Sequence, residues 1–231
     1  MKATLFALRS FGRELRSGEV LVLLAAVSLA VAALTAVGFL TDRIGKAVAR
    51  QANEVLAADL RLRSQAPVPD EWREVAGEFN LQTADTMSFP SVVFHGDDNA
   101  LSSIKVVSDS YPLRGAVRVA DELFGEQREV DGIPAAGEVW ADGALLARVG
   151  ADVGDMLDIG ELHLRVSAVL TYRPDQSIGF ASLAPTVILN IADIGASGLI
   201  GEGSRVRYAL LVAGDDDDVA SFNDAISDKL P

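Results

Sequence analysis

The hydrophobic pattern of the chain changes sharply along its length, and its longest uninterrupted apolar run lies near the N-terminus. From Val20 to Leu40 no side chain is charged, and the run reads VLVLLAAVSLAVAALTAVGFL. A helix rises about 1.5 Å per residue, so this segment can cross the roughly 30 Å hydrocarbon core of a bilayer. A secretory signal peptide has a shorter apolar core and a cleavage site, whereas this run continues directly into TDRIGKAVARQ. We therefore predict an uncleaved transmembrane helix over residues 20–40.

Residues 1–19, before this helix, form a basic segment with the pattern of an amphipathic helix. Arg9, Arg13 and Arg16 recur at helical spacing, and the apolar side chains fall mostly on the other side. The segment is either an interfacial helix in the headgroup layer or simply a charge that orients the span. Positive residues also follow the span, so the positive-inside bias is slight. The acidic chain beyond it is easier to translocate than to hold beside an anionic leaflet, which predicts a cytoplasmic N-terminus.

Beyond the span the apolar spacing stays helical and then changes to that of strands. Residues 41–57 have apolar side chains every three or four positions, with charged residues between them, which predicts an amphipathic stalk helix. At residues 58–63 the sequence ADLRLR alternates with a period of two, so a first strand begins there. Pro67 and Pro69 then predict a turn before a short helix, DEWREVAGEF.

The remaining chain predicts a strand-rich domain with short helices. Asp142 can cap a helix over GALLARV that Gly150 ends, and a closing helix follows the Asp run. The apolar stripe of that closing helix consists of Val219, Phe222, Ile226 and Leu230. Strands are expected over 81–95 and 101–108 around a turn at Gly96-Asp97-Asp98-Asn99, in a hairpin over 156–170 that turns at Gly160-Glu161, and over 185–190 and 205–213. In the second strand of that hairpin, Leu162, Leu164, Val166, Ala168 and Leu170 are expected to share one face. With no linker to divide it, we predict one α+β domain over 58–231.

Composition limits the classes of partner and chemistry. The chain has 231 residues, 49% of them hydrophobic, which is enough for one core besides the membrane segment. Lys and Arg total 20 against 33 Asp and Glu, and a formal charge of -13 repels a phosphate backbone. Nucleic acid is therefore excluded as an expected partner. The absence of Cys excludes disulfides, thiolate metal sites and Cys nucleophiles.

The sequence contains no pattern that predicts a catalytic, cofactor-binding or metal site. His95 and His163 are the only histidines, and neither has a second ligand at a helical spacing, so solvated side chains are the expected reading. Asp215 to Asp218 lack the alternating ligands, Gly and Glu of a calcium loop, and we expect a helix cap and solvated turn. Trp72 and Trp140 are expected to pack in the core. Because the hydrolase, phosphate-loop, dinucleotide and zinc-protease motifs are all missing, we predict no enzyme.

A set of segments in fixed order carries a family resemblance from about Ser10 to Val212. The segments are RSFGRELRSGE, the apolar span, LTDRIGKAV, LAADLRLRS, SFPSVVF, YPLRG, GEVWAD, VGDMLDIG, SLAPTVILNIADI and GSRVRYALL. In this order they resemble the beginning of the YbbP-like ABC transporter permeases, which belong with the FtsX/MacB-type permeases. The resemblance implies a MacB-like periplasmic core domain with a porter-like α/β part and an inserted small β-rich part. That inserted part is expected at about 97–175 and includes 137–171.

The resemblance also implies a function and its partners. Such permeases work with a second permease copy and a cytoplasmic ABC ATPase subunit in the bacterial inner membrane, and pass ATP-driven motion to the periplasmic domain. YbbP-like members are associated with a periplasmic esterase or thioesterase, which suggests handling or export of hydrophobic or lipid-like molecules. Membrane lipid would surround the helix. Family members carry further membrane helices, so this chain is expected to be the N-terminal part of a permease. The alternative is a single-pass, membrane-anchored binding or sensor module without an ATPase.

Overall fold

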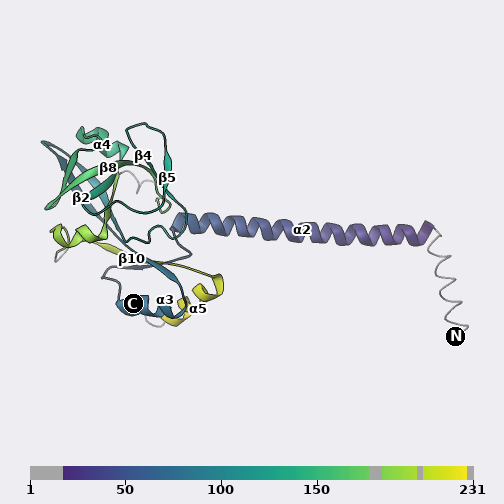
Figure 1. Cartoon of the computed structure of the whole chain (residues 1–231). Coiled ribbons are helices and arrows are strands. Elements are labelled where there is room, and N and C mark those ends of the chain that lie inside the picture. Colours follow the sequence, from purple (N-terminus) through teal and green to yellow (C-terminus); the bar gives the residue numbers. More distant parts are fainter. Residues whose placement is uncertain (1–17, 177–183, 202–204, 228–231) are drawn as a thin grey trace, which may run out of the picture. The chain divides into compact units, whose positions relative to one another are not determined.

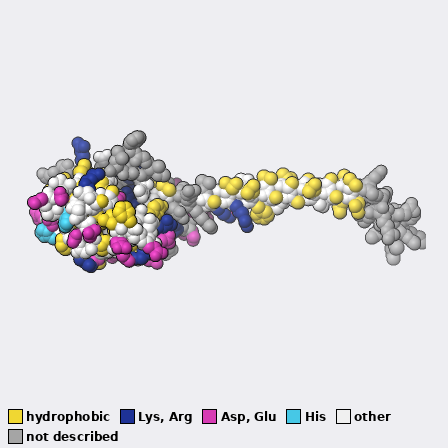
Figure 2. Space-filling view, turned by 90° about the horizontal axis from the view of Figure 1, so that it is seen from above, with side chains coloured by type: hydrophobic (Ala, Val, Ile, Leu, Met, Phe, Trp, Pro, Cys, Tyr) yellow, Lys and Arg dark blue, Asp and Glu magenta, His cyan; other side chains and the backbone are white. Residues whose placement is uncertain are grey.

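One long helix, α2, precedes the folded domain. A computed structural model of the chain describes residues 18–176, 184–201 and 205–227. Within it α2 runs unbroken over Gly18–Leu56 (Figure 1), so the predicted span and the predicted stalk segment belong to one helix. Its segment Leu21–Ala47 is long and apolar enough to cross a membrane, with a mean hydropathy of 2.5, and apolar side chains cover it in Figure 2. Residues 1–17 of the predicted basic segment lie outside the described residues.

The chain divides into two units, Met1–Arg50 and Gln51–Pro231, and the second contains every strand found in the described residues. Its helices are α3 (Asp70–Glu78), α4 (Gly143–Val149), the 3-10 helix η2 (Ile191–Ala196) and α5 (Asp216–Ser227). Its strands are β1 (Leu60–Ser64), β2 (Gln82–His95), β3 (Asp98–Val107), β4 (Val117–Ala120), β5 (Arg128–Val130), β6 (Glu138–Asp142), β7 (Met156–Ile159), β8 (Leu162–Tyr172), β9 (Thr186–Asn190) and β10 (Arg207–Ala213). One apolar helix followed by a mixed α/β domain confirms the predicted class.

The strands form one ten-stranded sheet in the order β1-β10-β2-β3-β9-β6-β8-β4-β5. The short strand β7 pairs with both β8 and β2, so the middle of the sheet closes on itself. The resulting ring runs β2-β3-β9-β6-β8-β7 and is a small barrel. The strands β2 and β9 lie outside the predicted inserted part at about 97–175. The β-rich part is therefore completed by strands that precede and follow that range.

A single hydrophobic cluster fills this barrel. Leu157, Ile159, Val166 and Val187 are fully buried in it, and Leu164 is nearly so. Three apolar residues of α4, namely Leu145, Leu146 and Val149, belong to the same cluster. As predicted, the carboxylate of Asp142 caps α4 by accepting from the Ala144 N–H at 2.9 Å, and Gly150 ends the helix in the left-handed region.

Outside the barrel, the helices α3 and α5 cover one face of β1 and β10 (Figure 1). The predicted stripe of α5 places Phe222 and Ile226 at full burial against Leu210 and Val212, while Leu230 lies outside the described residues. The apolar residues of α5, spaced by three and four positions, thus pack against an apolar strand face. Such packing stabilises a short amphipathic helix.

Two predicted strand details differ from the structure. The hairpin of β2 and β3 turns on Gly96-Asp97 alone, because Asp98 already pairs with His95, so Asp98 and Asn99 belong to the strand. In β8 the predicted single face breaks after Val166, where a bulge shifts the register with β6. Beyond the bulge Ala168, Val169 and Leu170 are all buried, because this end of the strand has hydrophobic clusters on both sides.

Candidate functional site: a cationic cavity

The side chains of β1 alternate between two faces of the sheet, and each face carries a different kind of side chain. Leu62 is buried in the cluster beneath α3 and α5, and Leu60 packs against that cluster. Because successive side chains of a strand point to opposite faces, Arg61 and Arg63 lie on the other face. Both arginines line a cavity. The alternating sequence LRLR therefore produces one apolar face and one cationic face.

The cationic face continues across the neighbouring strands. Residues directly opposite each other in paired strands point to the same side of a sheet. From β1 to β9 the register joins the cavity-lining residues through the pairs Arg63↔Ala209, Arg207↔Ser88, Ser88↔Lys105 and Ser103↔Thr186. One floor of arginine, lysine and hydroxyl side chains thus extends over five strands.

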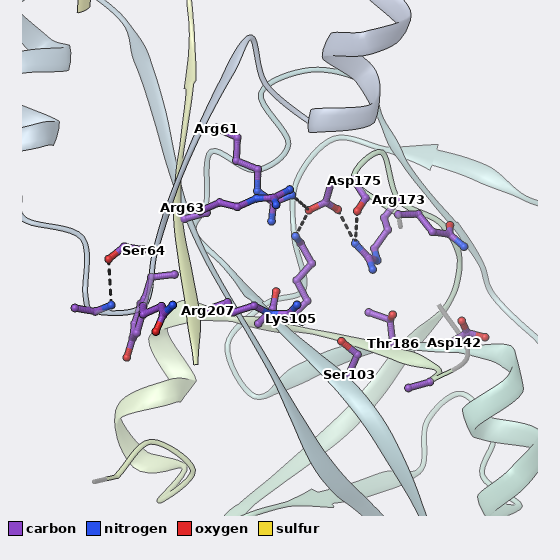
Figure 3. A pocket seen from close by; sticks show the side chains of 17 residues that line it. Arg61, Arg63, Ser64, Ser103, Lys105, Asp142, Arg173, Asp175, Thr186 and Arg207 are labelled. Carbon is purple, nitrogen blue, oxygen red and sulfur yellow. Dashed lines mark hydrogen bonds and ion pairs between the residues drawn. The ribbon is translucent and has the colours of Figure 1, made fainter. Parts of the chain in front are cut away.

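The cavity above this floor has a volume of about 860 Å³ (Figure 3). Among the described residues its cations are Arg61, Arg63, Lys105, Arg173 and Arg207, and its carboxylates are Asp142 and Asp175. Hydroxyl groups come from Ser64, Ser88, Ser103 and Thr186, and apolar surface comes from Ala66, Ala184 and Ala209. The lining is therefore positive, although the whole chain carries a formal charge of -13.

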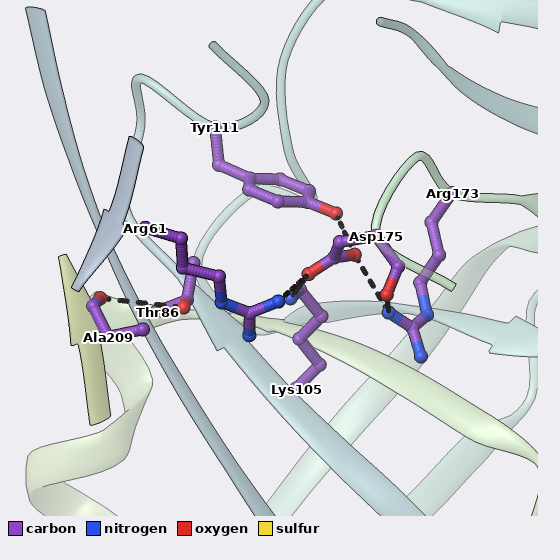
Figure 4. A network of polar contacts seen from close by, with 7 residues as sticks. All are labelled: Arg61, Thr86, Lys105, Tyr111, Arg173, Asp175 and Ala209. Atoms are coloured by element: carbon purple, nitrogen blue, oxygen red, sulfur yellow. Dashed lines mark hydrogen bonds and ion pairs between the residues drawn. The ribbon is translucent and has the colours of Figure 1, made fainter. Parts of the chain in front are cut away.

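Asp175 is the centre of a buried polar cluster at one side of the cavity (Figure 4). Its side chain is 1% exposed, and Lys105 Nζ donates a hydrogen bond to Oδ2. The Tyr111 hydroxyl and Arg173 Nη1 each donate to Oδ1 at 2.7 Å. Arg61 Nη1 lies 3.8 Å from Oδ2, so three cations surround one carboxylate.

Positive charge in this cluster exceeds what its own carboxylate neutralises. Burial lowers the pKa of Lys105 to about 8, and attraction by Asp175 offsets this only in part while Arg173 and Arg61 repel the ammonium. Burial likewise lowers the pKa of Arg61. The Nε of Arg61 is buried and has no hydrogen-bond partner among the described residues. The cluster can therefore accept a further anion.

The carboxylate itself is held ionised. Burial alone would raise the pKa of Asp175, but the charges of Lys105 and Arg173 and the hydrogen bonds from Lys105 and Tyr111 lower it well below its usual range. Burial and the nearby Asp175 raise the pKa of Tyr111 well above its usual value, so its hydroxyl stays a donor. The arrangement presents donors and positive charge, which suit the binding of an oxyanion.

The two histidines lie apart from this cluster in the hydrogen-bond pattern. His163 is exposed and its Nδ1 lies 2.6 Å from Asp158 Oδ1, its direct partner across β7 and β8. His95 Nδ1 lies 3.1 Å from the carbonyl oxygen of Val149. Within the described ranges no group of three or more His, Cys, Asp or Glu side chains could hold a metal ion. The absence of a metal site on the whole chain stays a prediction.

The aspartate run and the two tryptophans noted in the sequence have positions that serve the fold. Asp216, Asp217 and Asp218 form the first turn of α5, where carboxylates favour the positive end of the helix dipole. Trp72 on α3 and Trp140 on β6 are buried in two different hydrophobic clusters. The expectation that both indoles pack in the core is confirmed by their burial.

Sequence reasoning missed the residues of the cavity. Lys105 stands between Ile104 and Val106 in a strand where both neighbours are fully buried, and a lone lysine in such a run was a usable signal. The arginines of ADLRLR were a second usable signal, because a period of two places them together on one face of a strand. Asp175 gave no signal, since it follows β8 in a loop and meets Lys105 only through the fold.

Several segments on which the family resemblance rests converge here. Six of them supply residues of the cavity or its polar cluster: LAADLRLRS gives Arg61 and Arg63, SFPSVVF gives Ser88, YPLRG gives Tyr111, GEVWAD gives Asp142, SLAPTVILNIADI gives Thr186, and GSRVRYALL gives Arg207. Segments dispersed in the sequence are thus neighbours in space.

Comparison with known proteins extends the picture. The profile of the MacB-like periplasmic core domain matches residues 20–229. The chain is also 32% identical over 215 residues to YbbP of Escherichia coli (strain K12), described as an uncharacterized ABC transporter permease. That alignment covers 93% of this chain and 26% of YbbP, so the chain spans about a quarter of its relative's length.

Solved structures of similar domains show more distant likeness. The extracellular domain of the noncanonic ABC-type transporter YknZ from Gram-positive bacteria aligns with a TM-score of 0.46 and 10% identity, over 68% of this chain and 83% of that one. The periplasmic region of MacB from Actinobacillus actinomycetemcomitans gives 0.44 and 12%, over 68% and 73%.

The apolar helix and the mixed α/β domain agree with the family match and with the similarity to YbbP. A periplasmic domain preceded by an apolar helix of this length places the chain at the inner membrane. The chain belongs to the family of the MacB-like periplasmic core domain and is related to the ABC transporter permeases that contain it.

Proposed function

We propose that this chain is the membrane-anchored periplasmic part of an ABC transporter permease. Its N-terminus lies in the cytoplasm, and its domain lies in the periplasm. A separate cytoplasmic ATPase subunit supplies the energy, because no phosphate loop occurs in the sequence, and a second permease copy completes the assembly. The complex uses this energy to handle or export hydrophobic or lipid-like molecules, with a periplasmic esterase or thioesterase as a further partner.

The observation that carries this proposal is the anchored backbone that follows Leu56 within the second unit. α2 runs from its apolar segment to Leu56 without a break, and Ala57, which follows, is fully buried in the left-handed region. The Ala57 carbonyl oxygen accepts from the backbone N–H groups of Leu113 and Arg114, both at 3.0 Å. Two hydrogen bonds thus hold the backbone in this costly conformation between Leu56 and the first strand.

The side chain of Asp59 strengthens this anchoring of the backbone. Arg114 donates to both of its carboxylate oxygens, with Nε to Oδ1 at 3.0 Å and Nη2 to Oδ2 at 2.6 Å. The backbone N–H of Gly214 also donates to Oδ2, at 3.0 Å. Such a bidentate pair fixes geometry as well as adding energy. Force along the helix would therefore reach the strands β1 and β10, which begin and end beside these residues.

The proposal is tested by softening the helix in the full-length permease with its ATPase. A flexible Gly-Ser stretch inserted at Gly45 should leave assembly and ATP hydrolysis intact and abolish export, because the helix can no longer transmit displacement. The same stretch inserted at Gly132, in the loop between β5 and β6, is the matched control. Normal export with the Gly45 insertion would reduce α2 to a tether and contradict the proposal.

The orientation is tested separately with a periplasm-specific reporter enzyme fused after Pro231. The acidic domain predicts an active reporter that stays with the membrane fraction. An inactive reporter, or one released into the soluble periplasm, would contradict the proposed topology.

A second function has an observation in its favour. The cationic cavity would also suit a single-pass, membrane-anchored binding or sensor module that works without an ATPase. The two functions differ in one measurable property, since a binding module would not co-purify with an ATPase from native membranes. Co-purification of an ATPase subunit favours the permease.

A further inference from the structure

We propose that the cavity over the cationic face binds an anionic amphiphile, a molecule with a phosphate or carboxylate headgroup and a compact apolar part. The headgroup lies over Arg63, Lys105 and Arg207, and the apolar part lies against Ala66, Ala184 and Ala209. The inference deepens the proposed function and rests on it only in taking the ligand as lipid-like.

The first argument is charge. Of the five cations that line the cavity, three converge on the one carboxylate of Asp175. Asp142, the other lining carboxylate, is already engaged as the cap of α4. Cations gathered in a partly enclosed space repel one another unless an anion joins them, because the local dielectric is lower than that of water.

The second argument is the state of the donors. Among the described residues neither the side chain of Arg63 nor that of Arg207 has an ion pair or a hydrogen-bond partner. Both are exposed at the cavity, and a guanidinium matches the oxygens of a phosphate or carboxylate with two parallel donors. A cluster that served only to hold Asp175 would not need two further arginines on the same face.

The third argument is size and lining. Small-molecule sites have volumes of about 300–1,000 Å³, so the cavity of about 860 Å³ is far larger than one inorganic ion requires. Ala66, Ala184 and Ala209 supply apolar contact, and the hydroxyl groups of Ser88, Ser103 and Thr186 can donate to an oxyanion. A lining of donors beside apolar surface fits a molecule that is charged at one end.

Binding is measured by titration calorimetry on the full chain in nanodiscs of phosphatidylcholine, with empty nanodiscs as the blank. The probes are octyl phosphate, octanoate, octanol, octyltrimethylammonium and inorganic phosphate. We expect octyl phosphate and octanoate to bind, octyl phosphate more tightly than inorganic phosphate, and octanol and the cation to bind much more weakly. Added salt should weaken the binding of both anions.

The variant that tests the site is Arg63→Gln with Arg207→Gln. Both side chains are exposed, so the fold should persist, and octyl phosphate affinity should fall by about tenfold or more. Arg118→Gln with Arg128→Gln is the matched control, because it removes the same charge from exposed residues of β4 and β5 that do not line the cavity. Its affinity should stay unchanged.

Three results would overturn the inference. They are equal binding of octanol and octyl phosphate, equal binding of inorganic phosphate and octyl phosphate, and equal loss of affinity in the control variant. None of them requires an ATPase. Failure of the inference is therefore distinct from failure of the proposed function, which would show as normal export with a softened α2.

Discussion

The two faces of the strands β1 and β10 differ in almost every physical respect. Beneath α3 and α5 the face is apolar and its side chains, such as Leu62, Leu210 and Val212, are buried. On the opposite face Arg61, Arg63 and Arg207 meet a cavity instead of a helix. The two faces of these strands thus have opposite chemical character: one is apolar and covered by helices, and the other is cationic and lines a cavity.

The difference distinguishes residues that stabilise the fold from residues that could bind a ligand. Burying apolar area stabilises a fold by about 25 cal/mol per Å², so the helix-covered face accounts for much of the stability in this part. Buried charges contribute little, because their desolvation offsets their attraction, and cations in excess of carboxylates cost stability. A cationic face is therefore expected where function requires it, and the following changes test that division.

The largest effect is expected on the apolar face. Phe222→Ala should lower the free energy of unfolding by about 3–5 kcal/mol, because it opens a cavity at a fully buried position. Urea unfolding of the full chain in nonionic detergent, followed by the fluorescence of Trp72 and Trp140, measures this. Asn223→Ala, the next residue on α5, should change stability by less than about 0.5 kcal/mol. An equal loss in both variants would show that α5 does not dock by its stripe.

Asp175→Asn comes next, on the cationic face. It leaves Lys105, Arg61 and Arg173 without a carboxylate, and should lower the free energy of unfolding by about 3 kcal/mol. Asn keeps the size of the side chain, so the loss reports charge rather than packing. The same unfolding experiment measures it, and no loss would mean that the cations are solvated rather than dependent on Asp175.

The acid dependence of stability should change with the same substitution. The native pKa of Asp175 lies below its unfolded value of about 3.9, so its contribution is complete above about pH 5. Below that pH the unfolded chain binds a proton that the native state does not, and the contribution falls as pH falls. The stability difference between the wild type and Asp175→Asn should therefore shrink from about pH 5 to about pH 2. A constant difference would contradict an ionised Asp175 in the cluster.

A smaller effect on stability than that of Asp175→Asn is expected for Lys105→Met. Arg173, Arg61 and Tyr111 still hold Asp175, and a methionine of similar length removes a buried cation that was already in surplus. The free energy of unfolding should change by less than about 1.5 kcal/mol, with either sign. A loss as large as that of Asp175→Asn would show one tight ion pair instead of a shared carboxylate.

Local patterns in the sequence predicted much of the fold. The uncharged run, the helix between Asp142 and Gly150 and the stripe of α5 each follow from spacing and caps, and the structure contains all three. The closed barrel did not follow, because β7 joins β2 and β8 through pairings that no local pattern encodes. The bulge in β8 was equally invisible, since it depends on register with β6.

The candidate site was predicted least. Lys105, Tyr111 and Asp175 come from distant segments, and only the fold brings them together. Charge alone was misleading, since an acidic chain of -13 conceals a positive cavity. The alternation of leucine and arginine in β1 was the available clue, because it predicts two unlike faces before the content of either is known.

Adjacent residues of β1 offer the most direct test of the two faces. Stability and octyl phosphate affinity would be measured on the same preparations of Leu62→Ala and Arg63→Gln. Leu62→Ala should lower the free energy of unfolding by roughly 2–5 kcal/mol and keep the affinity of the folded protein. Arg63→Gln should keep stability within about 0.5 kcal/mol and weaken binding by about tenfold. If each variant loses stability and octyl phosphate affinity in the same proportion, the two faces do not have separate roles. That result would contradict the account.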